Sequence, residues 1–118
     1  MLIDAHTHAF ADKIADKAVE QLITYYRLPT ALGGRLPDLL AHAADARLDA
    51  LVLLVAATRP EKVAPAHDWM LSRPWDGLPN CPRIIPFGTF HPDDPHWRVE
   101  IDRLRAAGIR GIKLHPEF

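Results

Sequence analysis

Four short and mostly apolar runs recur along the chain, at residues 2–5, 51–57, 84–90 and 109–114. Residues 51–57 are continuously apolar and lack the alternation expected of a strand with one solvated face. A strand that is buried on both faces has this pattern, which is typical of a parallel sheet with helices outside it. We therefore predict a parallel sheet built from these four runs.

Segments with helical spacing of the hydrophobic residues separate the strands. The first helix follows Asp12, a candidate capping residue, and Pro29 ends it. A second helix starts near Pro37, and residues 93–95 open the last one, which Gly108 ends. The apolar face of the first helix comprises Ile14, Ala18, Val19, Leu22, Ile23 and Tyr26.

The start of the third helix has two interpretations. Residues 58–61 read Thr-Arg-Pro-Glu, the pattern of a capping box. Alternatively, the helix starts near Pro65, with proline in its first turn. His67 and Asp68 fall on this helix, and we expect such an isolated pair to face solvent.

Pro86 interrupts the run at 84–90, because proline has no N–H to donate to a sheet. Either the strand edge is unpaired at Pro86, or the strand begins at Phe87. With both readings the order is β-α-α-β-α-β-α-β, an α/β fold of parallel β/α units. Right-handed crossovers place the carboxyl end of every strand on one side of the sheet.

Composition limits the class of protein. The chain has 118 residues, 48% of them hydrophobic, and a formal net charge of −1, so we predict one domain over residues 1–118 and no nucleic-acid partner. No apolar run reaches the roughly 18 residues of a membrane span, and we expect no membrane partner. The first residues do not resemble a signal peptide, and Cys81 is the only cysteine, so we expect a cytoplasmic protein.

Two histidines follow the first apolar run directly. His6 and His8 stand at positions i and i+2, which point to the same face of a strand. Two neutral imidazoles held in this way are able to share one metal ion. Two surface histidines of a loop are the alternative. Asp4 has the same strand parity and is either an orienting partner of the histidines or a buried capping acid.

Polar residues also stand at the ends of later strands. His91 follows the run at 84–90, and Lys113 and His115 are again at positions i and i+2. Since active sites of parallel β/α proteins lie at the carboxyl ends of the strands, we expect these residues to gather near His6 and His8.

Three motifs together resemble the amidohydrolase superfamily, and most closely its amidohydrolase-related group of metal-dependent hydrolases. They are Ile-Asp-Ala-His-Thr-His at 3–8, Phe-Gly-Thr-Phe-His-Pro at 87–92 and Gly-Ile-Lys-Leu-His-Pro at 111–116. Members of this group fold as a (β/α)8 TIM barrel. The resemblance implies that His6 and His8 are metal ligands from the first strand.

The same resemblance implies roles for the later residues. In related binuclear enzymes, a carboxylated lysine at the end of the fourth strand bridges two metal ions. Lys113 is similarly placed, although a pocket-lining lysine is the alternative. Lys113 and His115 are thus candidate catalytic residues, and His91 is a weaker candidate. The implied cofactor is one or two divalent ions, zinc first, with manganese or iron as alternatives.

A complete eightfold barrel takes roughly 250 residues. We therefore expect the N-terminal half of such a barrel, without the ligands that the family carries on later strands. The implied reaction is attack of metal-activated water on an amide, ester or lactone carbonyl of a small-molecule substrate. The alternatives are a metal-dependent decarboxylase of the same group and a non-catalytic half-barrel that self-associates. Open edges on the first and fourth strands favour a homo-oligomer or docking of the remaining half.

Overall fold

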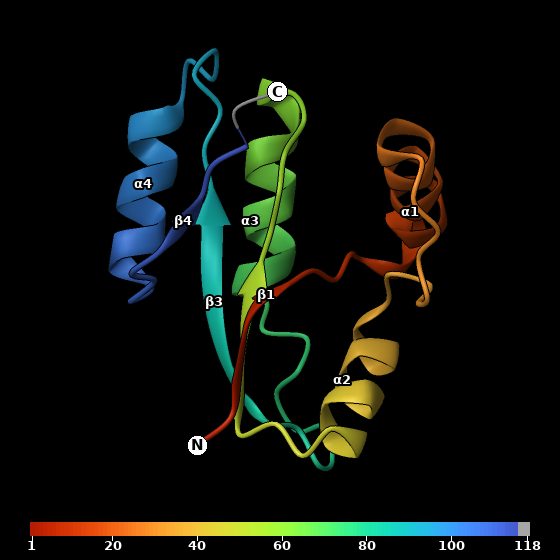
Figure 1. Cartoon of the computed structure of the whole chain (residues 1–118). Coiled ribbons are helices and arrows are strands. Elements are labelled where there is room, and N and C mark those ends of the chain that lie inside the picture. Colours follow the sequence, from red (N-terminus) through yellow and green to blue (C-terminus); the bar gives the residue numbers. More distant parts are fainter. Residues whose placement is uncertain (116–118) are drawn as a thin grey trace.

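The predicted α/β architecture is confirmed by a computed structural model, which describes residues 1–115 (Figure 1). Four parallel strands form one curled sheet in the order β1-β2-β3-β4, the arrangement of half a β/α barrel. Pro116 of the third motif lies outside the described residues. The elements are β1 (Ile3–Thr7), α1 (Asp12–Tyr26), α2 (Leu36–Asp45), β2 (Ala50–Leu54), the 3-10 turn η1 (Pro60–Lys62), α3 (Val63–Leu71), β3 (Arg83–Thr89), α4 (Trp97–Ala106) and β4 (Ile112–Lys113).

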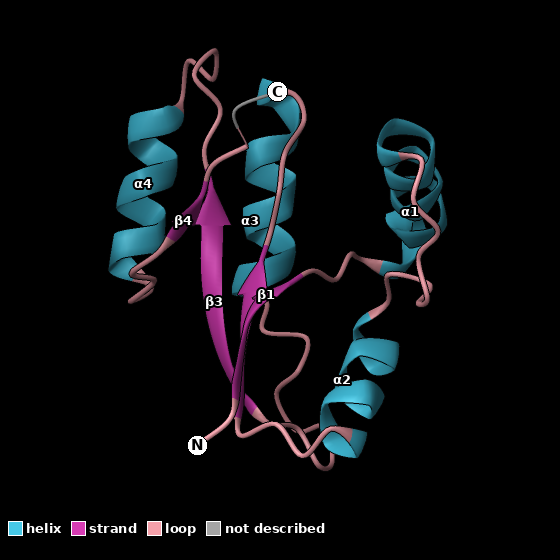
Figure 2. Ribbon diagram, viewed as in Figure 1, coloured by secondary structure: helices cyan, strands magenta, loops and turns pink. Residues whose placement is uncertain are grey.

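Strand β2 lies at the centre of the hydrophobic core, as its continuous apolar sequence predicts. Leu51 and Leu53 are completely buried. The helices α2, α3 and α4 contribute to the same core cluster, and Figure 2 shows α3 and α4 beside the strands. Their buried members are Leu36, Leu40, Ala43, Met70 and Leu104. This packing holds the sheet in place, and the candidate site lies at the carboxyl ends of its strands.

Pro86 lies within β3, opposite Leu53 of β2. The N–H of Gly88, two residues later and on the same edge of the strand, donates to the carbonyl of Gly111 at 3.0 Å. Strand β4 pairs only with Gly88 and Thr89. The nitrogen of Pro86 therefore points to the edge of β3 that faces β4, and within residues 1–115 this edge is unpaired at Pro86. This confirms the first of the two interpretations.

The capping box predicted at residues 58–61 is wrong. It would require Arg59 to be helical, but the residue before a proline is driven to extended backbone. Arg59 has φ −151° and ψ 151°, and no side chain caps η1. Helix α3 begins at Val63, so that Pro65 falls in its first turn as the second interpretation expected.

His67 is buried, and the expectation that it faces solvent is wrong. Its Nδ1–H donates to the Glu100 carboxylate at 2.7 Å, and its Nε2 accepts the N–H of Thr89 at 3.0 Å. Gly88 leaves the space for the ring, because a Cβ there would lie 3.1 Å from His67 Nε2 and 2.3 Å from a Leu104 methyl. Asp68 is exposed as expected and pairs with Arg103.

Helix α1 stands away from the other helices (Figure 1), and its apolar face is not packed like theirs. Ala15 is its one buried residue, whereas Ile14 is 48% exposed and Ile23 is 40% exposed. Asp12 lies in its first turn and does not cap it. None of the helices within residues 1–115 has the length and apolarity that crossing a bilayer requires.

The buried pair of His67 and Glu100 gives a prediction about stability. Glu100→Ala leaves the His67 Nδ1–H without its acceptor inside the core, so we expect the free energy of unfolding to fall by about 3 kcal/mol. Asp102→Ala, on the exposed side of the same helix, is the control and should change it by less than about 0.5 kcal/mol. Urea unfolding measures both, and equal effects would contradict the assigned role.

Candidate metal and catalytic site

A β-bulge in β1 determines which side chains face the site. Asp4 pairs with Leu51 and Thr7 with Leu53, so β1 advances three residues where β2 advances two. The extra residue reverses the alternation of side chains between Asp4 and the histidines. His6 and His8 line a large cavity, whereas Asp4 lines a separate recess beside α2. The prediction that Asp4 shares their face is therefore wrong, and Asp4 is also exposed.

His6 and His8 are hydrogen-bonded to each other through their Nε2 atoms, and the spacing of these atoms can be compared with that of two ligands of one metal ion. Their Nε2 atoms lie 3.2 Å apart, and the ring planes are inclined by 60°. Two imidazole nitrogens on one tetrahedral zinc ion, each about 2.05 Å from it, would lie about 3.3 Å apart. The observed separation therefore fits two of the four positions around such an ion.

A backbone hydrogen bond sets the tautomer of His8. Its Nδ1 lies 2.8 Å from the carbonyl of Leu54, which can only accept, so Nδ1 carries the proton and Nε2 keeps its lone pair. Burial lowers the pKa of His8 below its usual value, and the positive charges of His6, Lys113 and His115 lower this pKa further, against the opposing effect of the Leu54 bond. Burial and the neighbouring positive charges thus favour the neutral ring of His8, which is the form able to bind a metal ion.

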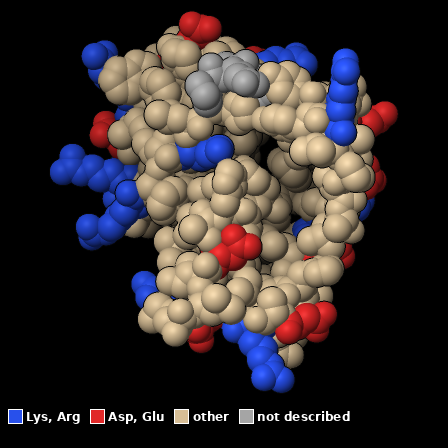
Figure 3. Space-filling view, in the orientation of Figure 1, with Lys and Arg blue, Asp and Glu red and all other residues tan. Residues whose placement is uncertain are grey.

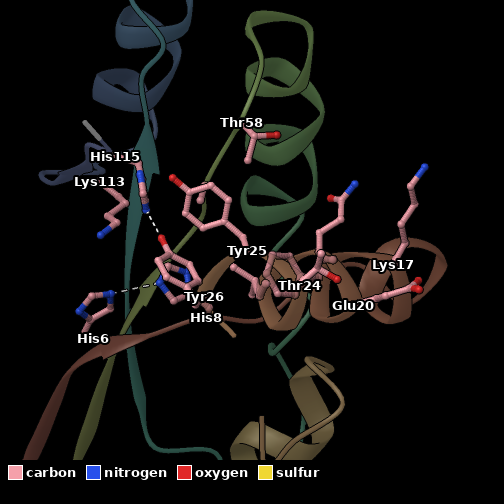
Figure 4. A pocket seen from close by; sticks show the side chains of 15 residues that line it. His6, His8, Lys17, Glu20, Thr24, Tyr25, Tyr26, Thr58, Lys113 and His115 are labelled. Atoms are coloured by element: carbon pink, nitrogen blue, oxygen red, sulfur yellow. Dashed lines mark hydrogen bonds between the residues drawn. The ribbon is translucent and has the colours of Figure 1, made fainter. Parts of the chain in front are cut away.

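Lys113 and His115 reach the same cavity from the end of β4, as expected. Figure 4 shows both near the histidine pair, and their charges act on His8. The Nε2 atom of His115 forms a hydrogen bond with the hydroxyl of Tyr26, and the two atoms lie 2.5 Å apart. Residues from β1, α1 and the end of β4 therefore meet at one place.

The cavity has a volume of about 920 Å³ and lies between the strand ends and α1. Figure 3 shows this face of the molecule hollowed beside the sheet. Phe10, Leu22 and Ala56 supply apolar wall, while the histidines and Lys113 supply the polar end. Such a site combines an apolar enclosure with a few convergent polar groups, as small-molecule sites do.

His91 does not join this group. It is buried, its Nδ1 accepts the N–H of Asp93 at 3.2 Å, and it does not line the cavity. In turn, the sequence interpretation missed Tyr25, Tyr26 and Thr58, which do line it. The adjacent tyrosines were a signal, because a phenol at the end of an apolar stripe carries a polar tip.

The described part of the chain supplies an incomplete set of metal ligands. Within residues 1–115, no three side chains of His, Cys, Asp or Glu are grouped so that they could hold an ion. A metal ion held by His6 and His8 would therefore need further donors from outside this group.

Comparison of the chain with models of protein families, with curated proteins and with solved structures finds no match. The motifs and the geometry of the cavity are therefore the features that indicate a function.

Proposed function

We propose that this chain carries the first-strand half of the metal site of an amidohydrolase-type hydrolase. The observation that carries the proposal is the 3.2 Å separation of the His6 and His8 Nε2 atoms at the wall of a large cavity. The ion is a divalent metal, with zinc preferred for two imidazole ligands and manganese or iron as alternatives. The substrate is a small molecule with an amide, ester or lactone carbonyl.

When bound, the divalent ion lowers the pKa of a coordinated water to about 7 and polarises the carbonyl group. The chain's own residues orient and enclose the reactants. The Leu54 carbonyl holds the ring of His8 with its Nε2 toward His6. Lys113 places a positive charge and a hydrogen-bond donor beside the cavity, where it would stabilise charge that develops on the substrate oxygen, and His115 lies next to it as a second candidate catalytic residue. Carboxylation of Lys113 would instead make it a ligand shared with a second ion.

The remaining ligands belong to another part of the assembly in this proposal. The chain acts as the N-terminal half of a TIM barrel, and either the second half or another copy of the chain contributes the missing donors. The open sheet supports this view, because among the described residues β1 and β4 each pair with only one neighbour.

A non-catalytic half-barrel that self-associates is the second candidate, and the apolar residues at the sheet edges favour it. Ile112 in β4 is 40% exposed and Leu114 is 61% exposed. Leu2 and Ile3, at the start of β1, are also exposed. An open edge flanked by apolar side chains is a template for pairing with another chain.

The metal pair is tested by zinc binding. We expect His6→Ala and His8→Ala each to weaken zinc affinity by at least about tenfold, because each removes one nitrogen donor. His42→Ala is the matched control, since His42 is exposed on α2 and does not line the cavity. Isothermal titration calorimetry measures the affinity. Equal affinity in all four proteins would exclude the pair as a zinc site.

Catalysis is tested with zinc-loaded chain and a panel of nitrophenyl esters, lactones and anilides. The hydrolase proposal predicts release of product above the rate of free zinc, and loss of that excess in His8→Ala. Lys113→Met keeps the length of the side chain, removes its charge and should lower the excess rate about tenfold or more. Stoichiometric zinc without any excess rate would favour the non-catalytic half-barrel.

Self-association is tested by light scattering across a range of protein concentrations. If the chain pairs with itself through its sheet edges, the measured mass should be at least twice the 13.2 kDa of one chain. Ile112→Lys places a charge at the β4 edge and should shift the mass toward the monomer. A monomer at every concentration would rule out the self-associating alternative for this chain.

A further inference from the structure

We infer that Tyr26 positions His115 and fastens α1 over the cavity. The inference rests on the proposed function only in taking His115 as a site residue. The contact joins the last residue of α1 to a residue 89 positions later in the chain, beyond the end of β4.

Apolar packing holds α1 only weakly. Ala15 is its one buried residue, and Tyr26 itself is 42% exposed. Polar contacts at both ends also connect α1 to the rest of the chain. Near its amino end, Asp16 accepts two hydrogen bonds from the Arg35 guanidinium, both 2.9 Å long.

Tyr26 provides the corresponding contact at the carboxyl end of α1. Its hydroxyl lies 2.5 Å from Nε2 of His115. Figure 4 shows the two side chains pointing toward each other beside His8. Helix α1 ends there, because Arg27 adopts left-handed backbone with φ 54°. The bond therefore joins two walls of the cavity, the carboxyl end of α1 and the segment that follows β4.

This bond couples two features of the site. If α1 moves away, the cavity loses a wall and His115 loses the partner of its Nε2 atom at the same time. A ligand that fills the cavity contacts both sides and would hold α1 in the closed position. Tyr26 is thus a positioning residue, which acts through His115 and through the helix that carries it.

Hydrogen–deuterium exchange of α1 tests the inference. Tyr26→Phe removes one oxygen atom and should accelerate exchange in the last two turns of α1 about three- to tenfold, as expected for loss of one hydrogen bond. His115→Ala should have a similar effect. The double variant should add little to either single variant, because both remove the same bond. Thr24→Val is the matched control, since it also removes one hydroxyl from this turn, and within residues 1–115 the Thr24 hydroxyl has no hydrogen bond.

A second readout follows His115 directly. In the metal-free protein, Tyr26→Phe should shift the ¹⁵N signal of His115 Nε2 and leave that of His8 Nε2 in place. Unchanged exchange of α1 in Tyr26→Phe, or an equal change in Thr24→Val, would overturn the inference. Failure of zinc to bind His6 and His8 would instead count against the proposed function alone, because neither readout requires metal.

Discussion

The parallel pairing of β1 with β2 is the interaction on which the candidate site depends. Strand β2 is fixed in the core, so its carbonyls serve as rigid acceptors for side chains of β1. Thr7 donates to the carbonyl of Val52 and His8 to that of Leu54, both at 2.8 Å. The bulge between Asp4 and Thr7 then determines which face each residue occupies. A slip of one residue would turn both histidines away from the cavity.

A series of hydrogen bonds connects α3 and α4 to Lys113, on the β4 side of the site. Glu100 accepts from His67, His67 accepts the N–H of Thr89, and the Thr89 hydroxyl donates to the Lys113 carbonyl at 3.3 Å. Each of these hydrogen-bonded groups has a partner, and the low dielectric of the core strengthens such bonds. The packing of α3 against α4 therefore influences where β4 presents Lys113. The site is supported from β2 on one side and from the helix layer on the other.

Features that depend on the local sequence pattern could be predicted from the sequence. The predictions failed for features that depend on contacts with residues distant in the sequence. The continuous apolar run of β2 predicted a buried parallel strand, and Gly108 predicted the end of α4, where it has φ +77°. The burial of His67 depends on Gly88 and Glu100, which lie far away in the sequence. The bulge in β1 depends on its register with β2 and has no local signature such as glycine. Likewise, the amphipathic pattern of α1 predicted a helix but not what would cover it.

Within residues 1–115, the same physical feature leaves the sheet open and the proposed metal site incomplete. The strands supply ligands only from their carboxyl ends, and a barrel gathers those ends around one axis. The four strands bring His6, His8, Lys113 and His115 to one side of that axis. The proposed metal site would therefore have two histidine ligands from this half, where an ion needs about four. Further strands added at the edges of β1 and β4 would pair the free backbone groups and bring donors to the opposite side. Closure of the sheet and completion of the site are therefore one structural requirement.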